Sequence, residues 1–161
     1  MEPIVVQQVV EPPRGIFSAK LDDKGRLKLP SGFHEYFSKL PEKKVFVTSL
    51  DRRTAQVYPI SEWRQNEKFF ENYTADPRLG RRISFNAQDL GSEAEIDSQG
   101  RVLFSMELRK ELDLENKPVR LYMYRGRIEI LTEAIYEARK REAMAETAAD
   151  DLEKLEAAGL K

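Results

Sequence analysis

The sequence predicts an α+β protein made of two copies of one strand–turn–strand–helix unit. Two observations predict this class: apolar and polar residues alternate on either side of Gly-containing turns, and the same pattern recurs 75 residues later. Residues 17–37 and 92–112 align at this offset. The aligned pairs keep their chemical character: Leu21 with Ile96, Asp22 with Asp97, Gly25 with Gly100, Arg26 with Arg101, Leu27 with Val102, Phe33 with Leu108, and Phe37 with Leu112.

Each copy opens with a predicted β-hairpin. Apolar residues alternate at 17–21 and again at 27–29, which is typical of strands with one buried face. The turn between them reads Asp-Asp-Lys-Gly, and its counterpart reads Asp-Ser-Gln-Gly. Aspartate can accept hydrogen bonds from the backbone of its own turn, and glycine tolerates the positive φ that ends it. The arginine four residues after each aspartate can pair with it across the turn. The expected structural turn motif consists of Asp22, Gly25, Asp97 and Gly100.

A short helix, two strands and a second helix follow the hairpin in each copy. The short helices are predicted at 30–37 and 105–112, where Pro or Ser begins a segment with apolar residues four apart. The strands that follow are rich in β-branched and aromatic residues. They are predicted at 44–49, 56–58, 119–124 and 127–131. Ser61 and Thr132 are the expected N-caps of the helices that come next.

The remaining segments join the two copies or extend them. We expect the connector to hold a helix with Trp63, Phe69 and Phe70 on its apolar face, and a strand around 83–85. The C-terminal tail has Ala and Leu seven residues apart, which predicts an amphipathic helix that packs on the body, pairs with another chain or frays. The expected division is a flexible extension at 1–13, a first repeat at 14–66, a connector at 67–91, a second repeat at 92–136 and a helical tail at 137–161.

Charge is unevenly distributed along the chain. The 27 Lys and Arg residues nearly balance the 28 Asp and Glu residues, and a net charge of −1 argues by itself against nucleic acid as a partner. However, residues 14–53 carry ten basic and five acidic side chains, whereas residues 131–161 carry five basic and eight acidic ones. Screening confines each charge to about 10 Å, so a local basic patch can attract phosphate even on a neutral chain. A solvated surface of mixed charge is the alternative.

Composition excludes several kinds of chemistry. The absence of Cys and the single His exclude disulfide scaffolds, thiol nucleophiles and multi-histidine metal sites. Glu93, Glu95 and Asp97 alternate along one strand, which favours a solvated face over a metal site. No catalytic constellation can be assembled, so we expect no enzyme activity, cofactor or small-molecule substrate. No apolar run approaches the roughly 20 residues that span a bilayer, and 4–10 is too short and too polar for a signal-peptide core, so we expect a cytoplasmic protein without membrane contact.

Several of these motifs together resemble the MraZ family. They are Arg14-Gly15, Leu21–Leu27, Leu29-Pro30, Tyr58–Trp63, Ile96–Val102, Leu108-Arg109 and Gly126–Ile130, and they cover about 14–136. The resemblance implies two AbrB-like repeats in a swapped-hairpin β-barrel, with flanking helices and a C-terminal helix. It also implies a transcriptional regulator that binds short direct repeats in the promoter of the division and cell-wall gene cluster. Such regulators assemble into ring-shaped homo-oligomers and associate with the nucleoid.

The resemblance points to the basic hairpins as the DNA-binding surface. Phosphate binding needs clustered positive side chains. The residues expected to provide them are Lys24, Arg26, Lys28, Arg14 and Arg101. We expect Arg101 to be mainly structural, through Asp97, because the second turn has no lysine. Two alternatives stay open: a solvated turn in which Arg26 only pairs with Asp22, and a ring-forming structural or interaction protein without specific DNA binding.

Two residues depart from the family pattern, and one basic cluster lies outside it. The family usually has Arg where this chain has His34, and Pro where it has Ser105. The change at His34 weakens any phosphate role of that position, whereas Ser105 can still cap a helix. In the connector, Arg78, Arg81 and Arg82 could line a subunit interface, contact DNA or belong to a solvated loop.

Overall fold

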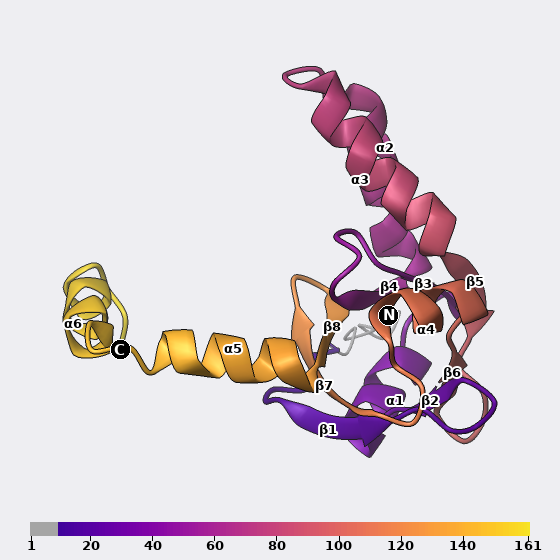
Figure 1. The fold of residues 1–161 in the computed structure, drawn as a ribbon, viewed down its shortest axis with the longest axis horizontal. Helices are drawn as coiled ribbons and strands as arrows, with labels where there is room; N and C mark the ends of the chain where they lie inside the picture. Colours follow the sequence, from indigo (N-terminus) through magenta and orange to yellow (C-terminus); the bar gives the residue numbers. More distant parts are fainter. Residues whose placement is uncertain (1–9) are drawn as a thin grey trace, which may run out of the picture.

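The strands form two antiparallel sheets (Figure 1). The computed structural model describes residues 10–161. Six strands lie in the order β1-β7-β8-β4-β3-β5, and β2 and β6 form a separate two-stranded ribbon. Their bounds are β1 (Phe17–Lys20), β2 (Arg26–Lys28), β3 (Lys44–Thr48), β4 (Ala55–Pro59), β5 (Ser92–Glu95), β6 (Arg101–Leu103), β7 (Pro118–Tyr124) and β8 (Arg127–Thr132). The predicted α+β class is confirmed, although within residues 10–161 the strand pairing does not close into a barrel.

The two strands beside each turn, here called a hairpin, do not pair with each other as predicted but pair with strands of the other repeat. Across the first turn only Leu21 and Leu27 form an isolated bridge within the described residues. β1 lies antiparallel to β7, β5 lies antiparallel to β3, and β2 pairs with β6. The larger sheet therefore reads β1-β7-β8 from one edge and β5-β3-β4 from the other, and the halves meet at β4 and β8. The carbonyl of each turn glycine also accepts across the repeats, Gly25 from the N–H of Phe104 (2.9 Å) and Gly100 from the N–H of Leu29 (2.8 Å). Neither hairpin can leave its place without breaking backbone hydrogen bonds to the other copy.

Because of this exchange, both repeats contribute to one hydrophobic core. Leu27 and Val102, which face each other on the ribbon, are completely buried, and so is Phe104. The predicted alternation matches the inward face of β2 and β6, whereas β1 has no buried residue and β4 is buried throughout. A second, smaller cluster surrounds Trp63, whose ring stacks on Phe46 with 4.6 Å between centroids. Trp63 is therefore a core residue, as its pattern predicted.

The prediction of a strand around 83–85 is wrong, because this segment lies inside a helix. The helices are α1 (Ser31–Ser38), α2 (Ile60–Asn72), α3 (Pro77–Leu90), α4 (Met106–Leu112), α5 (Glu133–Ala143) and α6 (Ala148–Ala157). Asp76 caps α3 by accepting a hydrogen bond from the N–H of Leu79, and Pro77 is compatible with its first turn. The Asp-Pro pair therefore marks the start of a helix. α2 and α3 pack together as an arm that projects from the sheets (Figure 1).

The two predicted N-caps have different outcomes. Thr132 caps α5 by accepting a hydrogen bond from the N–H of Ile135 (3.3 Å). Ser61 does not cap α2, because the chain passes directly from Pro59 at the end of β4 into the helix at Ile60. No helix within residues 10–161 is long and apolar enough to cross a membrane.

The C-terminal tail forms two helices rather than the single helix predicted. α5 extends away from the sheets and α6 lies at its outer end (Figure 1). Neither helix has a buried residue, since Ala fills most of the predicted seam and offers little apolar surface. At the other end of the chain, residues 1–9 of the predicted extension lie outside the described residues.

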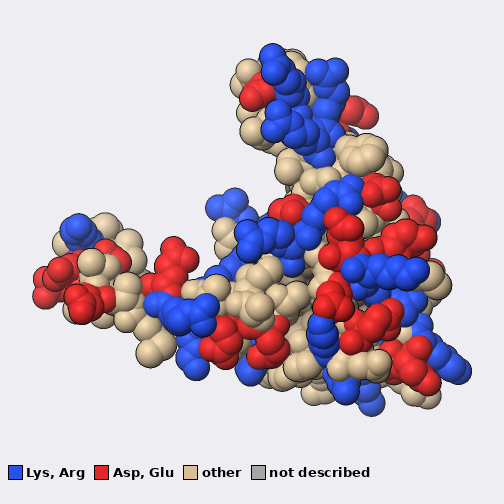
Figure 2. Space-filling view, in the orientation of Figure 1, with Lys and Arg blue, Asp and Glu red and all other residues tan. Residues whose placement is uncertain are grey.

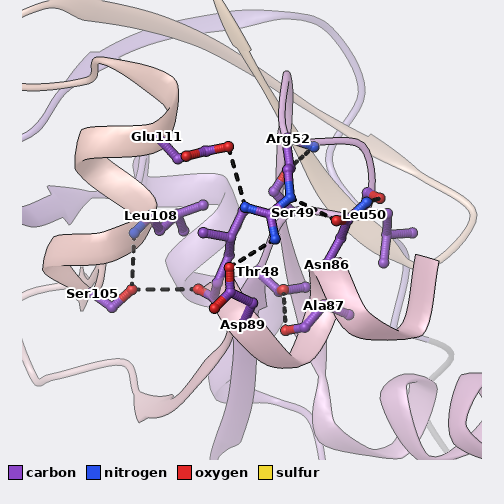
Figure 3. A network of polar contacts seen from close by, with 11 residues as sticks. Thr48, Ser49, Leu50, Arg52, Asn86, Ala87, Asp89, Ser105, Leu108 and Glu111 are labelled. Atoms are coloured by element: carbon purple, nitrogen blue, oxygen red, sulfur yellow. Dashed lines mark hydrogen bonds and ion pairs between the residues drawn. The ribbon is translucent and has the colours of Figure 1, made fainter. Parts of the chain in front are cut away.

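A polar network anchors α3 to both repeats (Figure 3). Arg52, in the turn between β3 and β4, donates a hydrogen bond to the side-chain oxygen of Asn86 (2.6 Å). Its guanidinium also pairs with Asp89 of α3 (2.7 Å) and Glu111 of α4 (3.2 Å). Asn86 in turn donates to the carbonyl of Leu50 (2.9 Å). Arg52 belongs to the basic segment 14–53, but two carboxylates offset its charge, so it contributes little to a phosphate-attracting surface.

Candidate nucleic-acid interface

The β2–β6 ribbon (residues 26–28 and 101–103) has one buried and one exposed face. Its register sets Arg26 opposite Leu103 and Lys28 opposite Arg101. Because residues directly opposite each other in an antiparallel pair share a face, these four side chains lie together. The central residue of each strand points into the core. The structure thus brings three of the five predicted DNA-binding residues onto one surface.

An aspartate holds each arginine of the ribbon. Asp22 Oδ1 accepts from the backbone N–H groups of Lys24 (3.0 Å) and Arg26 (2.9 Å), and Asp22 Oδ2 accepts from Arg26 Nε (2.9 Å). Asp97 holds Arg101 in the same way, with 2.8 Å between Oδ2 and Nε. Within residues 10–161 the Nη nitrogens of both arginines have no hydrogen-bond partner. Each guanidinium is therefore fixed through Nε while its two Nη groups can bind a phosphate or a base edge.

The sequence predicts that Arg101, unlike Arg26, is mainly structural. In the structure the two side chains have the same clasp and nearly equal exposed fractions, 27% for Arg101 and 29% for Arg26. Lysine is what distinguishes the two turns: Lys24 and Lys28 are exposed, and neither pairs with a carboxylate within the described range. Arg14 pairs with Glu11 (3.4 Å), and no hydrogen bond or ion pair among the described residues joins it to the ribbon.

The two Asp–Arg contacts, called clasps here, make the free energy of unfolding depend on pH. The backbone hydrogen bond from Arg26 lowers the pKa of Asp22 below its ordinary value of 3.8, and that from Arg101 lowers the pKa of Asp97. A carboxyl whose pKa is lower in the folded state stabilises the fold above its unfolded pKa. That contribution disappears as the pH falls through the folded value. We therefore expect the double variant D22N/D97N to lose less stability than the wild type between pH 5 and about pH 2 in urea unfolding. An identical loss in both proteins would contradict this account of the clasps.

Arg109 and His34, which have no predicted role in the turns, pack against the two turn glycines. A Cβ on Gly25 would lie 2.5 Å from Cζ of Arg109, and a Cβ on Gly100 would lie 3.0 Å from Nδ1 of His34. Arg109 is held in place by Glu115 (2.8 Å). His34 and Arg109 occupy equivalent positions in the two repeats, so each packs under the turn of the other copy. The repeat alignment shows that His34 and Arg109 are equivalent, but their contact with the turns depends on how the strands pair.

Both departures from the family pattern, His34 and Ser105, make structural contacts. The His34 ring packs against Gly100 of the second turn, where an added Cβ would meet its Nδ1 at 3.0 Å. Ser105 caps α4 by accepting a hydrogen bond from the N–H of Leu108 (3.2 Å), as expected for a serine at a helix start. The helix is therefore capped without the proline of the family pattern.

We expect alanine to destabilise the protein more at Gly25 than at Gly100. Both have φ of +80°, which costs an alanine about 1–2 kcal/mol. Gly25→Ala must also displace the anchored guanidinium of Arg109, so we expect it to lower the free energy of unfolding by about 2–3 kcal/mol. Gly100→Ala meets only the smaller ring of His34, and we expect about 1–2 kcal/mol. Urea unfolding checks the order, and the further change Arg109→Ala should relieve part of the Gly25→Ala cost. An equal loss in free energy of unfolding at the two glycines would show that the Arg109 guanidinium adds no cost at Gly25.

The second basic cluster lies on the arm. Arg78, Arg81 and Arg82 are exposed on α3, so the alternative of a loop is wrong. Figure 2 shows blue side chains over the outer end of the arm and others protruding at the end of the body where Figure 1 places β2 and β6. Within residues 10–161 no group of three Asp, Glu or His side chains is arranged to hold a metal ion.

Fold and site together define an α+β protein with two antiparallel sheets and a basic β-ribbon. No family model matches the chain. It is 32% identical to the transcriptional regulator MraZ of Ralstonia pickettii over 142 residues, which are 86% of this chain and 95% of the relative. It is 30% identical to that of Nitrosococcus oceani over 82% of this chain and 90% of the relative. The match to that of Acidobacterium capsulatum, at 32%, covers 60% of this chain and 66% of the relative. The chain belongs to the MraZ family.

Proposed function

We propose that the protein is a transcriptional regulator that binds specific sites on double-stranded DNA through the β2–β6 ribbon. The observation that carries the proposal is the shared face of Arg26, Lys28 and Arg101. Arginines that are held through Nε bind phosphate or guanine at a smaller cost in side-chain entropy than free ones do. Lys24 extends the positive surface at the tip of the first turn. Among the described residues Arg14 has no hydrogen bond to the ribbon, so we assign it an additional phosphate contact outside the ribbon.

The finer points of the proposal rest on the family resemblance. We propose that the chain assembles into a ring-shaped homo-oligomer and binds short direct repeats in the promoter of the division and cell-wall gene cluster. A head-to-tail ring presents equivalent ribbons in the same direction, which suits direct repeats better than a two-fold dimer does. Several ribbons on one duplex would also increase affinity through their effective concentration. In the cell, such a protein works in the cytoplasm at the nucleoid.

The exchange of hairpins supports a further point about the fold. We propose that the ribbon and the six-stranded sheet correspond to the swapped-hairpin barrel of AbrB-like repeats, with β2 and β6 at the contact between the two copies. In this arrangement a single chain holds both halves of the DNA-binding face.

Equilibrium binding of the full chain to DNA from upstream of its own gene tests the proposal. We expect tighter binding to this DNA than to an unrelated duplex of equal length, and an affinity that falls steeply as salt rises. Normal assembly without affinity for any duplex at low salt would overturn the proposal. That result would instead favour a ring-forming structural or interaction protein.

A further inference from the structure

The exposed face of the β2–β6 ribbon contains one apolar side chain among its cations. Leu103 is 52% exposed, lies directly opposite Arg26 and follows Arg101 by two residues on the same strand. A single exposed leucine needs no explanation on most surfaces. Here, however, its neighbours on the face are all positively charged, and a surface that bound only phosphate would gain nothing from it. The position therefore suggests contact with an apolar group on the same ligand.

The repeat makes this leucine more informative. At the offset of 75 residues, Leu103 is equivalent to Lys28, whereas Arg101 is equivalent to Arg26. The two halves of the ribbon thus share their arginines and differ at one position, which is cationic in one half and apolar in the other. A lysine can bind any phosphate, but a leucine cannot. The two halves of the ribbon are therefore suited to different features of a duplex.

We propose that Leu103 reads the 5-methyl group of a thymine, an inference that rests on the proposed DNA-binding function. The major groove of B-DNA admits a two-stranded β-ribbon, and the thymine methyl is the apolar group that a base edge presents there. Arg26 and Arg101, held by their aspartates, would contact phosphate or a guanine edge beside it. The difference between Lys28 and Leu103 then gives the ribbon a direction along the DNA, which sites arranged as direct repeats require.

Removal of single methyl groups from the DNA tests the proposal. In a duplex that the wild type binds, each thymine is replaced in turn by deoxyuridine, which lacks only the 5-methyl group. Burial of one methyl group is worth about fourfold in affinity, so we expect a loss of about threefold to tenfold at one thymine per ribbon. Leu103→Ala should bind the unmodified duplex more weakly by a similar factor and should be insensitive to that replacement. Met106→Ala is the matched control, since Met106 is also exposed but lies outside the ribbon, and this variant should keep the wild-type sensitivity.

A second variant, Leu103→Lys, tests whether an apolar side chain is needed at this position. Leu103→Lys copies the equivalent residue of the first repeat, so we expect binding that ignores the methyl group and a salt dependence steeper by about one phosphate contact. If the wild type binds DNA but tolerates deoxyuridine at every position, or if Leu103→Ala keeps the full sensitivity, the proposal is wrong. Those results leave the proposed function standing. A wild type that binds no duplex overturns both.

Discussion

The double variant R26A/R101A is expected to bind upstream DNA about a hundredfold more weakly than the wild type. Each guanidinium contact to a phosphate or a guanine contributes about 1–3 kcal/mol, and the variant loses two per chain. The slope of log affinity against log salt should also become shallower by about two contacts. Both effects follow from the Nη groups, which have no hydrogen-bond partner among the described residues 10–161. Fluorescence anisotropy over a salt series measures both quantities in one experiment.

A matched control separates ribbon contacts from a general loss of charge. Lys39 and Lys117 are exposed and lie outside the ribbon, so K39A/K117A removes the same number of positive charges. We expect this variant to bind within about threefold of the wild type, with a nearly unchanged salt slope. An equal loss in both double variants would mean that only net charge matters. The ribbon would then have no special part in binding.

The variant Phe104→Ala is expected to destabilise both repeats together. Phe104 is completely buried in the core that the two repeats share, and the loss of a large aromatic side chain from such a site costs about 3–5 kcal/mol. Its backbone N–H also bonds to Gly25 of the other copy. We therefore expect one cooperative transition for the sheets, with a midpoint shifted by the full cost of the substitution.

Trp63 reports this coupling without any added label. It is the single Trp of the chain, it is buried, and it lies on α2, which follows the strands of the first repeat. In Phe104→Ala, Trp63 fluorescence and far-ultraviolet circular dichroism should shift together to lower denaturant. As a control, Phe69→Ala removes an aromatic ring that is more than half exposed and should cost less than about 1 kcal/mol. A Trp63 transition that Phe104→Ala leaves in place would contradict a shared core.

Local patterns in the sequence predicted most elements of this fold, because alternation and turn chemistry act over a few residues. The strands at 44–48 and 127–132 agree with the predicted ranges to within a residue. Such patterns could not predict which strands pair, because alternation shows which face of a strand is buried but not which strand lies beside it. The strand wrongly predicted around 83–85 shows a related limit: Ile83 and Phe85 alternate, but they lie within α3, which Asp76 caps and whose Ala87 and Leu90 are buried.

The candidate site was predictable in its residue types and not in its geometry. Clustered charge alone left a solvated turn open, and the resemblance to the MraZ family made Arg26 and Arg101 candidates, with Arg101 expected to be mainly structural. Their meeting on one face depends on the pairing of β2 with β6, which joins segments 75 residues apart. The support from Arg109 and the exposure of Leu103 depend on the same exchange. These features arise from tertiary structure, so no window of sequence contains them.

Hydrogen–deuterium exchange with and without upstream DNA tests most directly whether the ribbon is the DNA-binding surface. If it is, peptides that cover 22–28 and 97–103 should gain protection when DNA is added. Peptides that cover Arg78–Arg82 on α3 should exchange at an unchanged rate, which makes the arm an internal control. Protection confined to the arm, with both turns unchanged, would contradict the assignment and place the DNA on the second basic cluster.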